Sequence, residues 1–337
     1  MKRALIIFLT VAMTAATMTA QEKRMAVVET STCYMRIAPD YESALETQEL
    51  MGTVVEIVGE QGYWREIVSP QPYKAWTTEK TLVEMTGEEI DEYKKAPKYM
   101  FTGLYGHIYT KPSEKSQTIC DLVGGDVMRM ALKGDRTDKA VRTERRAVTK
   151  GKWAQVVLPS GRTGWVCRKA IRPLDDRIDI RMGDKAEGKI SQEKMEDIIA
   201  SAMKLVGVPY MWGGMSSKGV DCSGLVRIAC IMNDVLLPRN ASQQIKCGVP
   251  VEVPHADEYN RDTALKATSN LERGDLVFFG KPATEDKPMR VTHVGIYLGD
   301  NHIIHASHLV RINSLIPGDE DYYENAHRLI AACRLVN

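Results

Sequence analysis

The chain has 337 residues, with 45 Lys and Arg against 44 Asp and Glu, so its formal net charge at pH 7 is only +1. A charge this close to zero provides no large electrostatic field, which argues against nucleic acid or an anionic membrane surface as the main partner. The length predicts two or three domains, each able to bury a core of its own. A locally basic stretch at residues 133–153 is interpreted as a solvated loop.

The N-terminus reads MKRALIIFLTVAMTAATMTA, with two basic residues, an apolar segment and then small residues up to Ala20. This order is typical of a secretory signal peptide at residues 1–20. An uncleaved membrane anchor is the alternative, but the apolar segment is short for a bilayer span of roughly 20 residues. We therefore expect an exported protein, periplasmic or extracellular, that is monomeric and not inserted in a membrane.

The chain contains seven cysteines: Cys33, Cys120, Cys167, Cys222, Cys230, Cys247 and Cys333. Disulfides are compatible with export, but an odd number leaves at least one thiol outside them. The spacing contains no C-x-x-C zinc pattern, and the chain has no H-E-x-x-H motif. We therefore expect no metal or other cofactor.

The N-terminal half contains an internal repeat. Residues 62–76 (GYWREIVSPQPYKAW) and 151–165 (GKWAQVVLPSGRTGW) both place two tryptophans 12 residues apart around a Val/Ile run and a turn. Short runs of this composition, separated by Gly and Pro turns, favour small all-β barrels. Both copies resemble bacterial SH3-like modules, which we predict at residues 21–97 and 98–175. A purely structural role without a ligand is the alternative.

Residues 176–190 are charged and rich in turn formers, so we predict a linker there. Ser191 is then positioned to cap a helix whose apolar residues recur at the 3.6-residue period. The third predicted domain extends from this helix over residues 191–337.

Cys222 lies in the segment YMWGGMSSKGVDCSGLVRIAC, residues 210–230. The apolar residues that follow it have helical spacing, so the cysteine is predicted in the first turn of a buried helix. A helix N-terminus favours the thiolate through its partial positive charge, and its N–H groups can also hold an oxyanion. Cys222 is therefore the candidate nucleophile.

A thiol that attacks an amide needs a proton carrier, and residues 291–307 (VTHVGIYLGDNHIIHAS) offer two histidines on a predicted β-hairpin. His293 and His305 share a face only if the turn has three residues or the hairpin contains a bulge. A plain two-residue turn would place them on opposite faces. A His dyad therefore requires a specific register.

Residues 191–337 resemble the NlpC-type peptidoglycan endopeptidases, a family of papain-like cysteine peptidases. The stretches that carry the resemblance are GVPYMWGG, DCSGLV, LPRNASQQ, RGDLVFFG, THVGIYLGD and IIHAS, in the family's order. The resemblance implies an α+β papain-like fold with Cys222 as nucleophile, His293 as general base and His305 as the residue that orients His293. It also implies that Tyr210 lies near the oxyanion.

The whole chain resembles γ-D-glutamyl-L-diamino acid endopeptidases, which cut cell-wall peptides that begin with a free L-Ala. The resemblance implies that Asp221 and Ser223 bind the substrate amine, and Asp221 is also a candidate helix N-cap. Ser242 is a further candidate for substrate contact. From the first SH3-like module, Tyr73 and Glu46 are carried over as residues that close the amine end of the groove.

Two other functions remain open at this stage. The protein could be a general muralytic hydrolase acting on intact peptidoglycan, or a non-catalytic wall-binding protein. The sequence does not distinguish diaminopimelate from Lys in the substrate. Residues 249–271 and 281–289 have the character of insertions that border the cleft.

Overall fold

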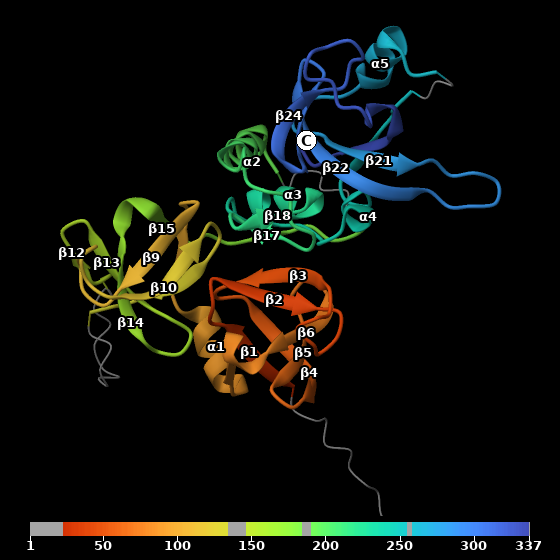
Figure 1. The fold of residues 1–337 in the computed structure, drawn as a ribbon. Coiled ribbons are helices and arrows are strands. Elements are labelled where there is room, and N and C mark those ends of the chain that lie inside the picture. The colour runs from red at the N-terminus through yellow and green to blue at the C-terminus, as the bar shows by residue number, and fades with distance from the viewer. Residues whose placement is uncertain (1–22, 134–145, 184–189, 255–257, 337) are drawn as a thin grey trace, which may run out of the picture.

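The computed structural model describes residues 23–133, 146–183, 190–254 and 258–336. It consists of two β modules followed by a larger C-terminal domain of helices and strands (Figure 1). The predicted signal peptide and most of the predicted basic loop lie outside the described residues. None of the helices in the described ranges is both long enough and apolar enough to cross a bilayer.

The first β module contains one sheet with the strand order β3-β2-β6-β5-β4-β1-β7. Its strands are β1 (Arg24–Val28), β2 (Thr32–Arg36), β3 (Leu45–Leu50), β4 (Val54–Gln61), β5 (Trp64–Val68), β6 (Lys74–Thr78) and β7 (Leu82–Met85). A short 3-10 turn, η1 (Glu79–Thr81), precedes β7, and helix α1 (Gly87–Lys95) follows it. The side chain of Thr86 caps α1 by accepting from the Glu89 amide.

The second β module has the order β10-β9-β14-β13-β11-β8-β15, with β12 added beside β13. Its elements are β8 (Lys98–Phe101), β9 (Tyr105–Tyr109), β10 (Thr118–Val123), β11 (Val127–Met130), β12 (Thr149–Lys150), β13 (Trp153–Val157), β14 (Thr163–Cys167), η2 (Arg168–Ala170) and β15 (Ile171–Pro173). The two strand orders correspond position by position.

The tryptophan repeat occupies equivalent places in the two modules. Trp64 opens β5 and lies opposite Thr78 in β6, while Trp153 opens β13 and lies opposite Cys167 in β14. The sequence repeat is therefore a structural repeat, and both copies are β-sheet modules as predicted. In the described residues each sheet runs as an open path from one edge strand to the other.

The predicted linker at 176–190 packs in part against the C-terminal domain. Strand β16 (Ile178–Asp179) pairs in parallel with β19 (Val235–Leu236). Ile180 and Ile190 are buried in the core of that domain. Part of this segment is therefore fixed to the C-terminal domain by its few apolar side chains. The predominance of charged residues in the segment had favoured a linker instead.

The C-terminal domain is built on a six-stranded antiparallel sheet with the order β20-β25-β21-β22-β23-β24. The strands are β20 (Val249–Val251), β21 (Leu276–Lys281), β22 (Arg290–Gly299), β23 (His302–Ser307), β24 (Leu309–Ser314) and β25 (Leu329–Arg334), the last preceded by η3 (Ala326–Arg328). The remaining elements are α2 (Gln192–Lys204), β17 (Met215–Ser216), β18 (Gly219–Val220), α3 (Cys222–Ile231), α4 (Ala241–Gln244) and α5 (Arg261–Thr268).

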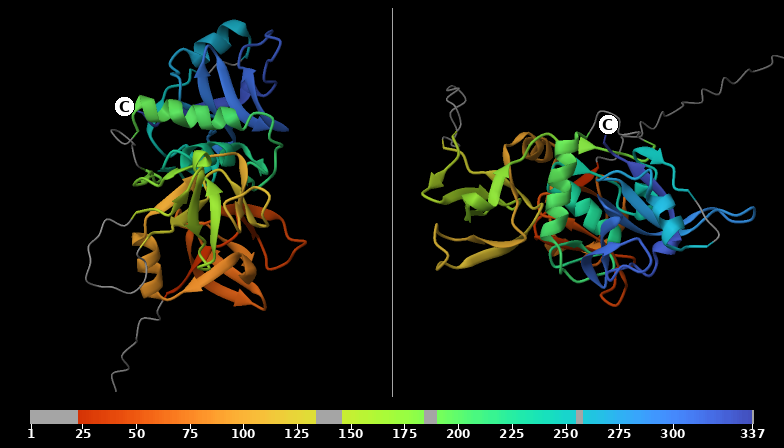
Figure 2. Two further views of the ribbon diagram at one scale, coloured as in Figure 1. Left: turned by 90° about the vertical axis from the view of Figure 1, so that its left-hand side faces the viewer. Right: turned by 90° about the horizontal axis from the view of Figure 1, so that it is seen from above.

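Helix α3 lies at the centre of this domain. All ten of its residues are buried, and it contacts α2 on one side and strands β22 and β23 on another. Ser191 caps α2 through its side chain, as predicted. In the left view of Figure 2, α2 lies across the domain, with the β modules on one side of it and most of the six-stranded sheet on the other. The expected helix packed on an antiparallel sheet is therefore present.

The first β module is joined to the C-terminal domain through strand β3. The side chain of Gln48 accepts a hydrogen bond from the Met215 amide at 2.9 Å, and Leu50 belongs to the main core of the C-terminal domain. Glu49 forms a buried ion pair with Arg227 of α3 at 3.4 Å. One strand of this module is thus part of the support for the central helix.

The second β module contacts the same domain through polar groups and through Val123, which is buried in the main core of that domain. Lys218 pairs with Asp121 at 2.7 Å, and Arg172 pairs with Asp234 at 2.6 Å. Ser217 donates to the carbonyl of Leu104. The contacts of Ser217 and Lys218 hold the turn between β17 and β18, which directly precedes α3, whereas Arg172 binds the segment that follows α3.

Candidate active site

Cys222 is the first residue of helix α3, as the sequence predicted. Its neighbour Asp221 is the N-cap, and Asp221 Oδ1 accepts a hydrogen bond from the Gly224 amide at 2.7 Å. Cys222 is 9% exposed and lines a cleft. A helix N-terminus therefore presents the sulfur to a space that a ligand can enter.

The hairpin of β22 and β23 has the register that the two histidines require. Gly295 lies opposite His305, and an irregularity between Tyr297 and Gly299 shifts the pairing by one residue before the turn. His293 and His305 consequently share a face, with His293 Nε2 2.8 Å from His305 Nδ1. The prediction of a bulged hairpin is confirmed.

Asn313 on β24 extends this line of polar groups. His305 Nε2 lies 3.0 Å from Asn313 Oδ1, and Asn313 Nδ2 donates to the carbonyl of Asp321 at 2.6 Å. Since the Asn313 oxygen must accept, a neutral His305 carries its proton on Nε2 and accepts from His293 through Nδ1. His293 is then left with an unprotonated Nδ1, the state that a proton acceptor needs.

Sequence reasoning missed Asn313. A polar residue between the apolar positions of a strand that follows the histidine hairpin was the available signal. Its pairing was not visible from the sequence, because it depends on how β24 aligns beside β23.

Aromatic rings hold the two imidazoles in place. Tyr323 packs edge-on against His305, with ring centroids 4.5 Å apart, and lies 5.8 Å from the His293 ring. Phe279 contacts His293 from the neighbouring strand at 5.8 Å. The imidazoles are therefore enclosed by apolar surface.

Burial dominates the electrostatics of the three predicted reactive groups. It raises the pKa of Cys222 to about 11, with the nearby Asp221 carboxylate adding to the rise. It lowers the pKa of His293 to about 3 and that of His305 to about 4. Burial therefore opposes the thiolate that the helix N-terminus favours, and the amides of Val294 and Ser223 lower the pKa of Cys222 by less than burial raises it.

The cleft has a volume of about 360 Å³ and brings together all the substrate-contact residues that were predicted. Beside Cys222 it is lined by Glu46, Tyr73, Tyr210, Asp221, Ser223 and Ser242. Two of these come from the first β module, more than 130 residues before the cysteine in the chain. These segments were expected to border the cleft, but no described residue of 249–271 or 281–289 lines it. That expectation is therefore wrong.

The carboxylate of Asp221 is already paired. Arg239 holds it with a two-pronged contact, Nη1 to Oδ1 at 3.0 Å and Nη2 to Oδ2 at 2.5 Å, and the Gly213 amide also donates to Oδ2. The same guanidinium donates to Ser223 Oγ at 3.0 Å and, through Nε, to Thr47 Oγ1 at 2.7 Å. The N-cap role of Asp221 is therefore confirmed, and its charge is balanced before any substrate amine arrives.

Glu46 has different surroundings. Tyr73 donates its hydroxyl hydrogen bond to Glu46 Oε1, and burial together with this bond raises the pKa of Tyr73 to about 12. In the described part of the chain no Lys or Arg forms an ion pair with Glu46. The first β module thus supplies an unbalanced negative charge to the cleft wall.

Two further features of the cleft concern its aromatic residues. Tyr210 is fixed by its backbone amide, which donates to the carbonyl of His308 at 2.8 Å, and burial raises the pKa of its phenol to about 12. Trp212 also lines the cleft and is 67% exposed, although sequence reasoning assigned it no role. Its large apolar face is available to a bound peptide.

The described residues contain no cluster of three or more His, Cys, Asp or Glu that could hold a metal ion. No disulfide joins described residues, although the seven cysteines all lie among them.

Comparison with known proteins places this site in a family. The model of the NlpC/P60 family matches residues 207–328, a range that contains Cys222, His293, His305 and Asn313. Residues 207–328 form an NlpC/P60 domain. The family is one of papain-like cysteine peptidases, in agreement with the resemblance found in the sequence.

Two curated relatives match far beyond the NlpC/P60 domain. A γ-D-glutamyl-L-lysine dipeptidyl-peptidase of Bacillus cereus is 26% identical over 298 residues, 85% of this chain and 75% of that protein. Dipeptidyl-peptidase 6 of Lysinibacillus sphaericus is 24% identical over 282 residues, 82% of this chain and 86% of that protein. Both alignments take in most of the β modules as well.

A solved structure shares the fold. The crystal structure of an NlpC/P60 family protein from Bacillus cereus superposes with a TM-score of 0.68 at 22% identity, covering 93% of this chain and all of that one. The fold of the β modules together with the NlpC/P60 domain is therefore shared with that solved protein.

Proposed function

We propose that this protein is a cysteine endopeptidase that hydrolyses the γ-D-Glu–L-diamino acid bond of cell-wall peptides with a free N-terminal L-Ala. The observation that carries the proposal is the line of hydrogen bonds from His293 through His305 to Asn313, together with a cleft that Cys222 lines. The family match and the names of the two relatives support the substrate class.

The chemistry follows from the protonation states. As the Cys222 sulfur attacks the carbonyl carbon, its proton passes to Nδ1 of His293, and the carbonyl oxygen becomes an oxyanion near Tyr210 and the amides at the start of α3. His293 then returns the proton to the leaving amine, which breaks the amide bond and leaves a thioester. Water, deprotonated by His293, hydrolyses the thioester and restores the thiol.

The substrate amine is assigned to the wall formed by the first β module. Glu46 provides a carboxylate without a cationic partner in the described ranges, and Tyr73 orients that carboxylate. Ser223 and Ser242 line the same cleft and serve as further hydrogen-bond partners. Asp221 is assigned a secondary role, since Arg239 already balances its charge.

We further infer that both β modules are SH3-like. Their matching strand orders and the Trp-marked strands support this assignment. In this proposal the first module closes the amine end of the cleft, and the second supports the loop before α3. The domain limits remain those predicted from the sequence.

The proposed substrate implies a place of action outside the cytoplasm. Together with the predicted signal peptide, it leads us to propose a monomeric protein exported to the periplasm or the exterior, where wall peptides are produced.

The test is mass spectrometry of the products from L-Ala-γ-D-Glu-diamino acid peptides with free and acetylated amines. Burying an ammonium against a carboxylate is favourable only while the charge is present, so acetylation should lower kcat/KM by at least about tenfold. Glu46→Gln should reduce this discrimination, whereas Glu42→Gln, on an exposed turn of the same module, should preserve it. Equal rates on both peptides, or release of peptides from intact sacculi, would instead favour a muralytic hydrolase.

A further inference from the structure

The cleft contains a second charged side chain whose charge is not balanced. Arg290 is the first residue of β22, lies three positions before His293 and lines the same cleft as Cys222 and Glu46. Its side chain is exposed, and within the described ranges it has neither an ion-pair nor a hydrogen-bond partner. The cleft therefore presents an unpaired anion and an unpaired cation.

Arginines elsewhere in this domain are generally paired. Arg239 binds Asp221, Arg227 contacts Glu49, and Arg334 is held by Asp275. Arg290 differs from them in pointing to a space that holds a ligand-sized volume.

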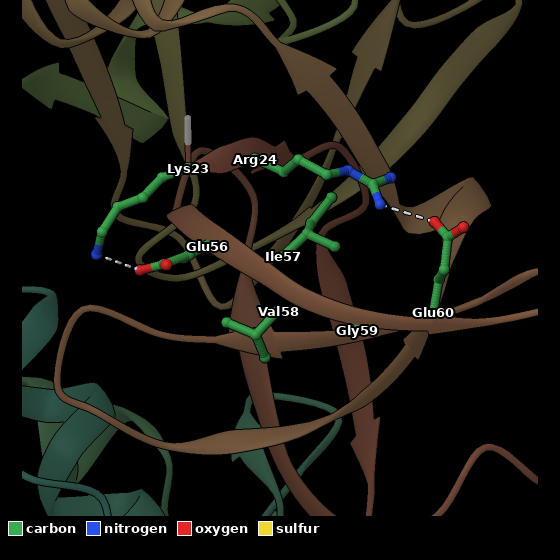
Figure 3. A pocket seen from close by; sticks show the side chains of 7 residues that line it. All are labelled: Lys23, Arg24, Glu56, Ile57, Val58, Gly59 and Glu60. Atoms are coloured by element: carbon green, nitrogen blue, oxygen red, sulfur yellow. Dashed lines mark hydrogen bonds and ion pairs between the residues drawn. The ribbon is translucent and has the colours of Figure 1, made fainter. Parts of the chain in front are cut away.

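The hollow on the first β module provides a contrast (Figure 3). It has a comparable volume of about 330 Å³, but its charges are balanced locally, with Lys23 paired to Glu56 at 2.8 Å and Arg24 to Glu60 at 2.7 Å. An incoming carboxylate there would have to displace one already present. At Arg290 no such competition exists among the described residues.

A second guanidinium reinforces the positive side of the cleft. Arg328 donates from Nη2 to Thr292 Oγ1 at 3.2 Å. Thr292 lies between Arg290 and His293 in the chain and lines the cleft. Arg328 is also close enough to contribute to the lowered pKa of His293. This part of the β22 wall thus favours negative charge in a bound ligand.

The proposed substrate carries carboxylates that would suit this wall. A γ-linked D-Glu retains its α-carboxylate next to the scissile amide, and diaminopimelate carries a carboxylate at the end of its side chain, where Lys has none. A guanidinium can bind a carboxylate through two parallel hydrogen bonds, which gives both affinity and orientation.

We propose that Arg290 is a specificity residue that binds either the α-carboxylate of D-Glu or the side-chain carboxylate of diaminopimelate, while Glu46 on the first β module attracts the peptide's amine. This inference rests on the proposed function. The opposite charges orient a zwitterionic peptide in the cleft, so that its amine faces the module and its carboxylate faces β22. Neutral or reversed peptides lose this orientation.

The test compares Arg290→Gln with wild type on three peptides with free L-Ala amines: one with D-Glu and diaminopimelate, one with D-isoglutamine and diaminopimelate, and one with D-Glu and L-Lys. On the first peptide Arg290→Gln should lower kcat/KM by about tenfold, the loss of a charged hydrogen-bonded contact. Arg290→Lys should restore part of the loss because it keeps the charge without the planar fork.

Lys281→Gln is the matched control, since Lys281 lies opposite Arg290 in the β21–β22 pairing, is exposed, and does not line the cleft. It should leave all three rates unchanged.

The peptide on which Arg290→Gln and wild type become equal identifies the carboxylate. Equality on the D-isoglutamine peptide assigns the α-carboxylate of D-Glu, and equality on the Lys peptide assigns the diaminopimelate side chain. A uniform loss on all three peptides, no loss on any, or the same loss in Lys281→Gln would overturn the inference. Failure of wild type to cleave any of the peptides would instead contradict the proposed function.

Discussion

Thr47 of the first β module accepts a 2.7 Å hydrogen bond from Nε of Arg239, the residue that clamps the N-cap of the helix carrying Cys222. Arg239 is 2% exposed and Thr47 is fully buried. One buried guanidinium therefore links the module to the helix cap. This contact makes Thr47 a positioning residue for the proposed nucleophile.

Replacing Thr47 by Val should lower kcat with little change in KM. The variant keeps the shape of the side chain but leaves a buried guanidinium N–H without its acceptor, which costs about 1–3 kcal/mol. If half of that reaches the transition state through Asp221, kcat falls about threefold to tenfold. Thr47→Ser retains the oxygen and should behave like wild type. A rise in KM with unchanged kcat would show that Thr47 acts on substrate binding instead.

Cys222→Ala should abolish turnover and leave the fold intact, because it removes the covalent route. In enzymes with a nucleophile and base acting together, loss of the nucleophile costs on the order of a millionfold in kcat. Cys230→Ala, on the same buried helix but away from the cleft, provides the control and should retain activity. Residual activity of the Cys222 variant above about one per cent of wild type would contradict the assignment.

Asn313→Ala should lower kcat and spare KM. Without the Asn313 oxygen, His305 is free to place its proton on Nδ1, which would prevent it from accepting from His293. A change of tautomer in a buried triad has large effects on rate, and we expect a loss of about tenfold to a hundredfold. Asn313→Asp keeps an acceptor and should recover much of the rate, while its charge raises the pKa of His305 and moves the acid limb of the pH profile upward. A purely structural role for Asn313 would leave that limb in place.

Alkylation of Cys222 should be slow at pH 5 to 6 and accelerate as the pH rises toward the raised pKa of the thiol. Only the thiolate reacts, and below its pKa the thiolate fraction falls tenfold for each pH unit. Because burial raises the pKa of Cys222 to about 11, its labelling should lag behind that of an ordinary exposed thiol at every pH below this value. Site-resolved mass spectrometry after iodoacetamide treatment gives the rates. Fast labelling at pH 5 that disappears in His293→Ala would demonstrate a thiolate–imidazolium pair and contradict this expectation.

Local sequence patterns were sufficient for the elements that carry the site. The helical spacing after Cys222 predicted the start of α3. The Gly-Asp-Asn segment predicted the turn of the hairpin whose strands carry the two histidines. The bulged register followed from the requirement that both histidines lie on one face of the hairpin. These features depend on interactions between residues close in sequence, which is why they could be predicted.

The partners of the site residues could not be predicted in the same way. The contacts of Arg239 to Thr47 and Asp221 join it to residues 192 and 18 positions away in the chain. The pKa of Cys222 also depends on how completely the surrounding elements exclude water, a property of the assembled domain. Long-range packing thus determines both the partner of the Asp221 carboxylate and the burial that raises the pKa of the thiol.

Strand β3 has a consequence for how the protein folds. Leu50 completes the core around α3, and Glu49 is the counter-ion of Arg227, whose side chain is only 1% exposed. Removing the first β module would expose apolar surface of the C-terminal domain and deprive a buried guanidinium of its anion. The family match begins at residue 207, but β3 also belongs to the core around α3. We therefore expect the first β module and the C-terminal domain to unfold together, in one thermal transition.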